Sequence, residues 1–357
     1  MTIDKKFWQG KKVFVTGHTG FKGSWLCAIL KKLDCQVAGY SLEPNSEPNL
    51  FNTLNLSSKI DNHQIADICD FDKLLQAIKD FQPDIVFHMA AQSLVKYSYS
   101  HPRETYLTNV IGTVNLLDAV KECGGVKSTI VVTSDKCYDN KEVARGYKED
   151  DPMGGFDPYS NSKGCSELVA SSFANSFFIP MQSDIGKMAS VRAGNVIGGG
   201  DWSQDRLIPD IMKAIYSNSE IDIRSPNAIR PWQHVLEPLS GYMVVAQYLY
   251  NLESQQSPLS WNFGPEEKDQ KDVGSIVSFL QGHYQDKLKV NFPESKNIQH
   301  EAQLLFLDIS KVKKDLAWSP LLSIDEALTN TAQWYDCYYS KGDIESFTNL
   351  QIEQFIN

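Results

Sequence analysis

The chain opens with an apolar strand pattern, a glycine-rich turn and an apolar helix pattern. The strand covers residues 12–16 and the helix covers residues 24–33, and the turn between them contains Gly17, Gly20 and Gly23. A dinucleotide pyrophosphate binds backbone N–H groups at a helix N-terminus, where side chains would block its approach. Glycines alone are common in loops, but a preceding strand and a following helix are the context that this mechanism requires. The segment therefore predicts a dinucleotide-binding site.

Strand and helix patterns alternate along the following residues. We expect further strands at 36–40, 84–88, 128–133 and 188–192, and helices at 72–81, 108–123 and 159–176. Such alternation predicts a parallel sheet that is covered by helices on both faces. The expected fold is α/β: a Rossmann-type, doubly wound parallel sheet over residues 1–193 and a smaller α/β substrate-binding domain over residues 194–357. A helix expected at 239–252 would interleave the two domains if it packs back onto the first.

Composition and charge restrict the partners. The 357 residues have a net charge of -10, and Lys and Arg are scattered, so nucleic acid is not an expected partner. The seven cysteines are odd in number and form no CxxC pair, which favours reduced thiols and no metal site. Because the chain has neither a signal-peptide pattern nor an apolar run of about 18 residues, we expect a cytoplasmic protein without a membrane partner.

Other cofactor contacts follow from the strand ends. No acid or Arg ends the second strand, where Glu43 lies slightly beyond Leu42, so the choice between NAD and NADP stays open, although the absence of an Arg favours NAD. Asp67 and Ile68 either face the adenine or form a solvated turn. Small residues after the strand at 84–88 allow either close approach of a cofactor or tight helix packing. The predicted contacts are Gly17, His18, Thr19, Gly20, Phe21, Lys22, Gly23, Asp67, Ile68, Ala90, Ala91 and Gln92.

Tyr159 and Lys163 are one helical turn apart and share a face of the predicted helix. A free tyrosine, with a pKa of about 10, is a poor base at neutral pH, whereas a nearby ammonium favours its phenolate. The pair would also contribute to the cofactor site. Ser134 follows a predicted strand, at the sheet edge where ligands of parallel sheets bind, and can hydrogen-bond the same substrate alcohol. These residues predict transfer of a proton from an alcohol while a hydride leaves for the nicotinamide.

These motifs resemble the extended short-chain dehydrogenase/reductase family. The resemblance rests on residues 16–23, on Tyr159 and Lys163, and on Asn109, which it adds to the cofactor contacts. Within that family, residues 133–138, 205–209 and 230–235 are similar to the CDP-glucose 4,6-dehydratases. The similarity extends from about residue 8 to residue 335.

The resemblance implies a reaction without net redox change. NAD oxidises C4, the C5 proton becomes acidic, water is lost across C5 and C6, and the hydride returns to C6. Tyr159 would be the C4 base, Lys163 would tune it, and Ser134 would orient the alcohol. Asp135 matches the acid that protonates the departing C6 hydroxyl.

Two residues depart from the family pattern. Lys136 stands where dTDP-glucose dehydratases have a glutamate that removes the C5 proton, so it either takes part in C5 deprotonation or only contacts substrate. His18 stands where many relatives have a small residue. Its imidazole either crowds the pyrophosphate, which predicts weak retention of NAD, or turns toward solvent.

The resemblance also implies the ligands and partners. The substrate would be CDP-glucose, with its diphosphate held by cations and polar groups of the second domain, and the expected contacts are Ser134, Asn195, Arg206, Leu207 and Arg230. Subunits would pair through the helices at 108–123 and 159–176 into a homodimer or homotetramer. The pathway would supply 3,6-dideoxy sugars to the O-antigen of lipopolysaccharide. Two alternatives remain: a sugar-nucleotide 4-epimerase, which does not need Asp135, and a catalytically silent dinucleotide sensor, which the Tyr159–Lys163 pair opposes.

Overall fold

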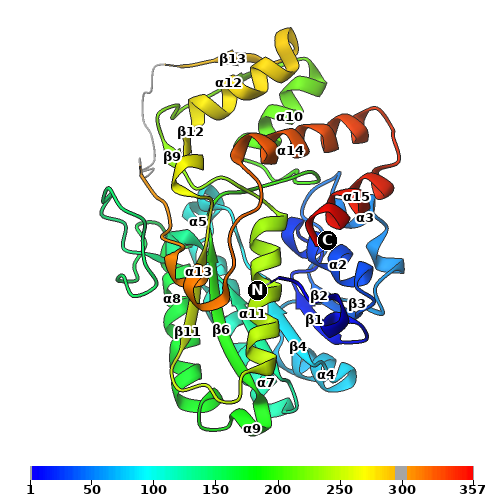
Figure 1. Ribbon diagram of the computed structural model, residues 1–357, viewed down its shortest axis with the longest axis vertical. Helices are drawn as coiled ribbons and strands as arrows, with labels where there is room; N and C mark the ends of the chain where they lie inside the picture. Colours follow the sequence, from blue (N-terminus) through cyan, green and yellow to red (C-terminus); the bar gives the residue numbers. More distant parts are fainter. Residues whose placement is uncertain (1, 294–303, 357) are drawn as a thin grey trace.

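A computed structural model describes residues 2–293 and 304–356 of the chain, and its central element is a seven-stranded parallel sheet (Figure 1). The strand order is β11-β6-β5-β4-β1-β2-β3, with every neighbouring pair parallel. This is the order of a Rossmann fold, so the predicted fold class is confirmed. The strands are β1 (Lys12–Thr16), β2 (Gln36–Ser41), β3 (Asn62–Ile65), β4 (Ile85–His88), β5 (Ser128–Val132), β6 (Lys187–Ala193) and β11 (Leu259–Phe263).

Helices cover both faces of this sheet. On one face, α2 (Phe21–Lys32), α11 (Leu236–Asn251) and α15 (Ile344–Ile356) join the larger hydrophobic cluster, in which Trp25 and Leu239 are fully buried. On the other face, α4 (Phe71–Phe81), α7 (Gly112–Cys123) and α8 (Pro158–Phe173) pack on a second cluster. Because both faces are covered, β1, β4 and β5 are almost continuously buried, and each has an apolar run, as the sequence indicated.

Most of the expected elements lie within a few residues of their predicted bounds. Two predicted helices are each built from two parts: a π-helical turn at Leu107–Ile111 precedes α7, and another at Ala174–Phe178 follows α8. Two strands of the sheet were not among the predicted ones. β3 is a polar edge strand without an apolar run, and β11 lies beyond residue 193.

A smaller layer of helices and short strand pairs lies above the sheet in Figure 1. The short strands pair as β7 with β10, β9 with β12, and β8 with β13. The domain boundary at residue 193 stays a prediction, but α11 packs on β5 and β6, and β11 pairs with β6, so the second half of the chain also contributes to the sheet. The layer contains β7 (Val196–Ile197), α10 (Leu207–Ser217), β8 (Glu220–Asp222), β9 (Ile229–Arg230), β10 (Gln233–His234), β12 (Lys271–Asp272), α12 (Val273–Tyr284), β13 (Lys289–Asn291) and α14 (Ile324–Tyr339).

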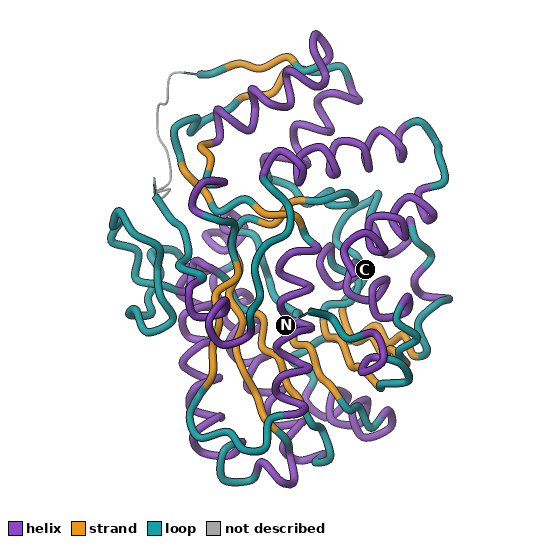
Figure 2. The backbone as a smooth tube through the Cα atoms, viewed as in Figure 1, coloured by secondary structure: helices purple, strands orange, loops and turns teal. Residues whose placement is uncertain are grey.

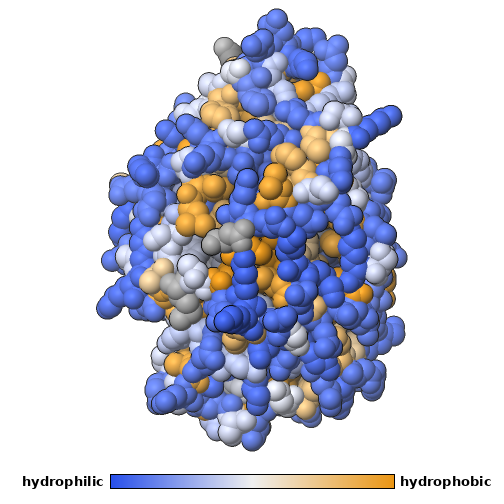
Figure 3. Space-filling model, turned by 45° about the vertical axis from the view of Figure 1, so that its right-hand side comes forward, coloured by the Kyte–Doolittle hydropathy of each residue, from blue (hydrophilic) through white to orange (hydrophobic). Residues whose placement is uncertain are grey.

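The remaining helices are short. They are α1 (Lys5–Trp8), α3 (Leu50–Thr53), α5 (Val95–Ser100), α6 (Pro102–Tyr106), α9 (Gln182–Ile185) and α13 (Ser310–Leu316). Across residues 2–293 and 304–356, no helix has the length and apolar content needed to cross a bilayer. The face shown in Figure 3 is largely hydrophilic, and the hydrophobic residues visible on it gather toward its middle.

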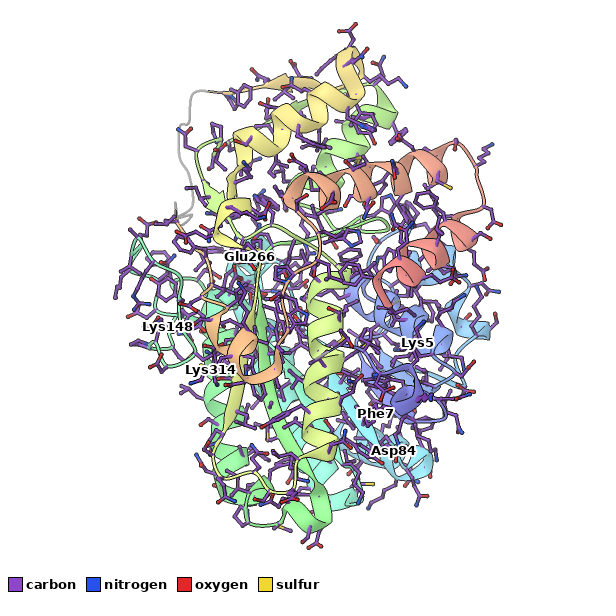
Figure 4. All side chains as sticks on the ribbon, in the orientation of Figure 1. Lys5, Phe7, Asp84, Lys148, Glu266 and Lys314 are labelled. Atoms are coloured by element: carbon purple, nitrogen blue, oxygen red, sulfur yellow. The ribbon has the colours of Figure 1, made fainter. Side chains whose placement is uncertain are left out.

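The sheet has two different ends. Asp84, labelled in Figure 4, precedes β4 at the amino end of the strands, where its carboxylate accepts a hydrogen bond of 2.9 Å from the Lys12 backbone N–H. At the opposite end the strands lead into the loops that Figure 2 shows between the sheet and the upper layer. Ligands of parallel sheets bind outside the carboxyl ends of the strands, so this is the end to search for a site.

Candidate functional site

A large cleft lies at the carboxyl ends of the strands, with a volume of about 1870 Å³. It is lined by residues after β1, β4, β5 and β6, by residues from the start of α10 and by the segment 221–225. Pockets for one drug-sized ligand usually measure about 300–1,000 Å³. The cleft therefore has room for two ligands of nucleotide size.

Most residues predicted for the site line this cleft together. They come from segments far apart in the sequence, which the sheet brings to one edge. The lining includes Gly17, Thr19, Gly20, Phe21, Lys22, Gly23, Asp67, Ile68, Ala90, Ala91, Ser134, Asp135, Lys136, Tyr159, Lys163, Asn195, Arg206, Leu207 and Arg230. The predicted residues His18, Gln92 and Asn109 do not belong to it.

Two positions of the glycine turn can hold no residue other than glycine. Gly17 has a φ of +72°, and a Cβ there would lie 2.7 Å from the Ala90 nitrogen. A Cβ on Gly23 would lie 2.1 Å from the Gly17 oxygen. The turn leads into α2, whose N-cap Gly20 places no side chain over the first N–H groups of the helix. These N–H groups are open toward the cleft, which suits the pyrophosphate of a dinucleotide.

His18 turns away from the cleft, so neither expectation for its side chain is met. The imidazole is fully buried, its Nε2 lies 2.8 Å from Nδ1 of His63, and its ring packs edge-on against Phe51. Burial, with a smaller contribution from His63, lowers the pKa of His18 to about 3. The ring is therefore a neutral packing group behind the turn, and it neither crowds the pyrophosphate position nor reaches solvent.

Asn109 and Gln92 do not line the cleft but hold the loop after β4 in place through hydrogen bonds. The Asn109 carboxamide accepts a hydrogen bond of 2.8 Å from the Gln92 backbone N–H and donates one of 3.0 Å to the Gln92 backbone oxygen. It also donates to the Ser162 hydroxyl at 2.8 Å. The Gln92 amide donates to Thr105 at 2.9 Å. Both side chains thus tie the loop after β4 to neighbouring helices, and their predicted contact with a cofactor is not supported by their placement.

The adenine end of the predicted site has ordinary loop contacts. Asp67 is exposed, and its carboxylate accepts a hydrogen bond of 2.9 Å from the Cys69 backbone N–H. Ile68 is buried, and its side chain packs tightly against Gly112. A Cβ on Gly112 would lie 2.7 Å from Cγ2 of Ile68. Ala90 and Ala91 are half-buried and leave room at the end of β4.

Tyr159 and Lys163 lie on the first turns of α8, facing the cleft, and both are buried. Burial raises the pKa of Tyr159 to about 12, and an interaction with Ser134 makes a smaller, opposing contribution. Burial lowers the pKa of Lys163 to about 8, and its Nζ donates to the Val132 oxygen at 3.5 Å. With this pKa the phenol is neutral at physiological pH.

Ser134, Asp135 and Lys136 form one cluster after β5. The Ser134 hydroxyl donates to Asp135 Oδ1 at 2.9 Å, and Lys136 Nζ lies 3.3 Å from the same oxygen. The other carboxylate oxygen, Oδ2, is buried without a hydrogen-bond partner. A buried polar atom of this kind is costly unless a ligand or another group uses it. The cluster therefore presents a hydroxyl, a carboxylate and an ammonium to one region of the cleft.

Several basic side chains lie among the residues that line the cleft. Burial, with Lys163 and then Arg206 as smaller contributions, lowers the pKa of Lys22 to about 7, and its Nζ lies 5.8 Å from the centre of the Tyr242 ring. Arg206 donates to Asp201 at 3.0 Å and to Ser93 at 3.1 Å. Arg230 is buried and lines the same cleft. Arginine side chains of this kind can bind an anionic ligand such as a diphosphate.

Two features of the site were not found from the sequence. Tyr242 of α11 is fully buried, with a hydroxyl that has no hydrogen-bond partner, and it interacts electrostatically with Asp135 and Tyr159. Glu167 lies one turn after Lys163 and pairs with Arg192 of β6. The spacing of Glu167 from Lys163 was visible in the sequence, but its partner was not, because β6 follows much later in the chain.

Comparison with known proteins shows to which family the chain belongs. The sequence model of the GDP-mannose 4,6-dehydratase family matches residues 14–331. The chain belongs to this family. Within it, a CDP-glucose 4,6-dehydratase from Salmonella typhimurium is 51% identical to the chain over 99% of both proteins.

More distant relatives share the architecture. A dTDP-glucose 4,6-dehydratase from Neisseria gonorrhoeae is 24% identical, over 92% of this chain and 96% of that protein. Among solved structures, a UDP-glucose 4-epimerase from Stenotrophomonas maltophila, determined with NAD and a UDP-sugar, has a TM-score of 0.79 at 19% identity and covers 93% of this chain and 100% of its own. At that identity the likeness shows only that this chain has the same fold as that epimerase.

Proposed function

We propose that the protein is an NAD-dependent CDP-glucose 4,6-dehydratase, which converts CDP-glucose to CDP-4-keto-6-deoxyglucose and water. The observation that carries this proposal is the 51% identity to a CDP-glucose 4,6-dehydratase along almost the whole length of both chains. The cleft agrees with it, since it has room for a dinucleotide and a nucleotide sugar. Reaction type and substrate thus both rest on this identity, and the size of the cleft is compatible with them.

NAD fits the residues of this chain. The N–H groups at the start of α2 suit its pyrophosphate, and the open backbone at Gly17 and Gly23 leaves room for it. Lys163 would hydrogen-bond the nicotinamide ribose, and Asp67 and Ile68 would border the adenine. When bound, NAD supplies a hydride acceptor that is regenerated within one turnover.

The side chains of this chain would handle the protons. Tyr159 would accept the proton of the C4 hydroxyl, and Ser134 would orient that hydroxyl. Asp135 would protonate the departing C6 hydroxyl, for which its buried carboxylate next to Ser134 is suited. Lys136, on the other side of Asp135, would take part in removing the C5 proton.

The second half of the chain would bind the substrate. Arg206 and Arg230 would contact the diphosphate, with Asn195 and Leu207 beside them. The cleft is lined from both sides of residue 193. We propose a cofactor part, 1–193, and a substrate part, 194–357, from which α11 and β11 return to the central sheet. The product would enter the synthesis of dideoxy sugars for lipopolysaccharide O-antigen.

Incubation of the purified protein with CDP-glucose and NAD tests the proposal. We expect a product lighter by one water in the mass spectrum, and little product from dTDP-glucose or GDP-mannose. A product of unchanged mass would instead identify a 4-epimerase, and bound NAD without any product would identify a sensor. Tyr159→Phe provides the matched control, with a loss of about 10²- to 10⁴-fold in turnover.

We also propose that subunits pair through the helices around residues 107–123 and α8. Three large apolar side chains of neighbouring helices are exposed there: Leu107 at 40%, Ile111 at 44% and Leu168 at 60%. Pairing would remove them from water. Sedimentation should show a dimer or tetramer that Leu168→Asp dissociates, whereas Leu350→Asp, at an exposed position of α15, should leave the oligomer intact. A monomeric wild-type protein would contradict the proposal.

A further inference from the structure

Two side chains from different parts of the chain hold the guanidinium of Arg206. Its Nη1 donates to Asp201 Oδ2 at 3.0 Å, and its Nη2 donates to the Ser93 hydroxyl at 3.1 Å. Asp201 lies shortly before α10, whereas Ser93 lies in the loop after β4, so these contacts join the two halves of the chain. Arginine has many rotamers, and contacts at both ends of its planar group exclude most of them.

Asp201 is itself firmly fixed. It is only 4% exposed, and its other carboxylate oxygen, Oδ1, accepts a hydrogen bond of 3.0 Å from the Ser203 backbone N–H. Its backbone oxygen accepts a hydrogen bond from the buried hydroxyl of Tyr335 in α14. A buried carboxylate is costly unless it is paired and hydrogen-bonded, and Arg206 provides the pairing. Asp201 therefore holds the guanidinium from a rigid position.

A second link joins the same two segments. Lys96 of α5 forms an ion pair with Asp205, the residue before Arg206. Asp205 has a φ of +59°, and a non-glycine residue keeps such a backbone conformation only where its surroundings fix it. Both side chains are about half exposed, so the pair adds little to overall stability. Its effect is local, because it restrains the backbone at the start of α10.

These contacts leave Arg206 able to bind a ligand. Ser93, Lys96, Asp201, Asp205 and Arg206 all line the cleft, and 32% of the Arg206 side chain is exposed. Only some of the N–H groups of the guanidinium are used by Asp201 and Ser93, and the others stay available. Phosphate oxygens bind best to such a planar group when it is already oriented.

We propose that Asp201 and Ser93 position Arg206 for the diphosphate of the sugar nucleotide. This inference rests on the proposed function, which assigns Arg206 to that diphosphate, and it adds the residues through which Arg206 acts. Asp201 and Ser93 are positioning residues, since they act through the guanidinium and not on the reacting atoms. The Lys96–Asp205 pair supports them by holding the start of α10 against the loop after β4.

The sign of one effect separates positioning from competition. A carboxylate 3.0 Å from a guanidinium attracts the same N–H groups that a phosphate needs. If Asp201 competes with the diphosphate, loss of its charge tightens binding. If Asp201 positions Arg206, loss of its charge weakens binding, because the guanidinium then adopts several orientations.

The test uses CDP, which is a nucleoside diphosphate without the sugar. It is titrated into the purified full-length protein in the presence of NAD, and calorimetry gives its Kd. We expect Asp201→Asn to raise this Kd by about tenfold, because the isosteric amide loses the charged contact with Arg206. Ser93→Ala, at an exposed position, should raise it by about two- to threefold, and Ser93→Thr should restore it because it keeps a hydroxyl.

Asp151→Asn is the matched control. Asp151 also pairs with an arginine, Arg145, at 2.6 Å and also accepts a backbone N–H, from Lys148 at 2.8 Å, but none of these three residues lines the cleft. This variant should bind CDP with the affinity of the wild type.

Two further readouts separate positioning from a merely structural role. In turnover of CDP-glucose, Asp201→Asn should raise KM and leave kcat within about twofold of the wild type, as expected for a group that affects binding alone. In an Arg206→Met background, Asp201→Asn should not change the Kd of CDP any further, because its effect passes through Arg206.

The outcomes separate this inference from the proposed function. CDP binding that is unchanged or tighter in both Asp201→Asn and Ser93→Ala would overturn the positioning role, as would an equal effect of Asp201→Asn with and without Arg206. If Asp201→Asn does not fold, Ser93→Ala and Ser93→Thr decide the question. Failure of the folded wild-type protein to bind CDP at all would instead overturn the proposed substrate.

Discussion

Glu167 and Arg192 form a buried ion pair close to the cluster of Ser134, Asp135 and Lys136, with 2.7 Å between Oε2 and Nη2 and only 4% of each side chain exposed. Glu167 also accepts hydrogen bonds from Thr133, which precedes Ser134, and from Ser190 at 2.7 Å. Burial raises the pKa of Glu167, but the guanidinium and these bonds outweigh it and hold the pKa below its usual value. The pair joins α8 to β5 and β6 and so fixes Lys163 relative to Ser134.

Removing the charge of Glu167 should therefore be costly. Glu167→Gln leaves the Arg192 guanidinium buried without a counter-ion, and we expect a loss of about 3–5 kcal/mol in the free energy of unfolding. Urea denaturation measures this loss. Lys73→Gln, which breaks the exposed pair between Lys73 and Asp70, serves as the control and should leave the midpoint unchanged. Equal effects of the two variants would contradict the role of the buried pair.

The packing of His18 behind the glycine turn makes Gly39 sensitive to substitution. A Cβ at Gly39 would lie 2.3 Å from His18 Cδ2, so Gly39→Ala should destabilise the protein by about 1–3 kcal/mol. His18→Ala removes the colliding ring. In the double variant the two effects should be strongly non-additive, with Gly39→Ala costing little. Strict additivity of the two unfolding free energies would show that His18 does not occupy this position.

The lowered pKa of Lys163 predicts how stability depends on pH. Below pH 8 the folded protein holds a buried ammonium at a cost, and between about pH 8 and 10.5 the folded state loses this proton while the unfolded state keeps it. Stability of the wild type should therefore rise through this window relative to Lys163→Met. A shift of one pKa unit corresponds to about 1.4 kcal/mol. At pH 7 the free energy of unfolding of Lys163→Met should therefore exceed that of the wild type by up to about 3 kcal/mol.

Urea midpoints of both proteins at pH 7 and pH 10 provide the measurement for Lys163. The exposed Lys79→Met change should show no such dependence. If the advantage of Lys163→Met were the same at both pH values, the amine of Lys163 would not titrate in this range.

Lys136 lies beside the acid of the proposed elimination, and we expect it to take part in removing the C5 proton. In Lys136→Ala, entry of solvent deuterium at C5 of the trapped 4-ketone should slow by about 10²-fold or more. Lys141 also lines the cleft but pairs with Asp139 at 2.9 Å, so Lys141→Ala is the matched control. Exchange at the wild-type rate in Lys136→Ala would assign the base to another group.

The sequence predicted those parts of the molecule that follow from local pattern. Apolar runs located β1, β4, β5 and β6, and the spacing of Gly17 and Gly23 located the turn, because these features depend on neighbouring residues alone. β3 was not predicted, because an edge strand can be polar and this one has no apolar run.

The direction of individual side chains was harder to predict. The turn motif fixes the backbone around His18, but only the tertiary packing of Phe51 and His63 decides where the imidazole goes. Asn109 was assigned to the cofactor from a motif, whereas its hydrogen bonds go to Gln92 and Ser162. Similarly, the pairing of Glu167 with Arg192 depends on the strand order, which no local pattern contains.

The fate of the hydrogen at C4 tests the central claim most directly. CDP-glucose labelled with deuterium at C4 is converted by the purified protein with NAD, and the product is analysed by NMR. A 4,6-dehydratase moves this hydrogen within one sugar, so we predict one deuterium in the C6 methyl group of the 4-keto product. Deuterium that is found at C4 of an epimer, or lost to solvent, would contradict the account.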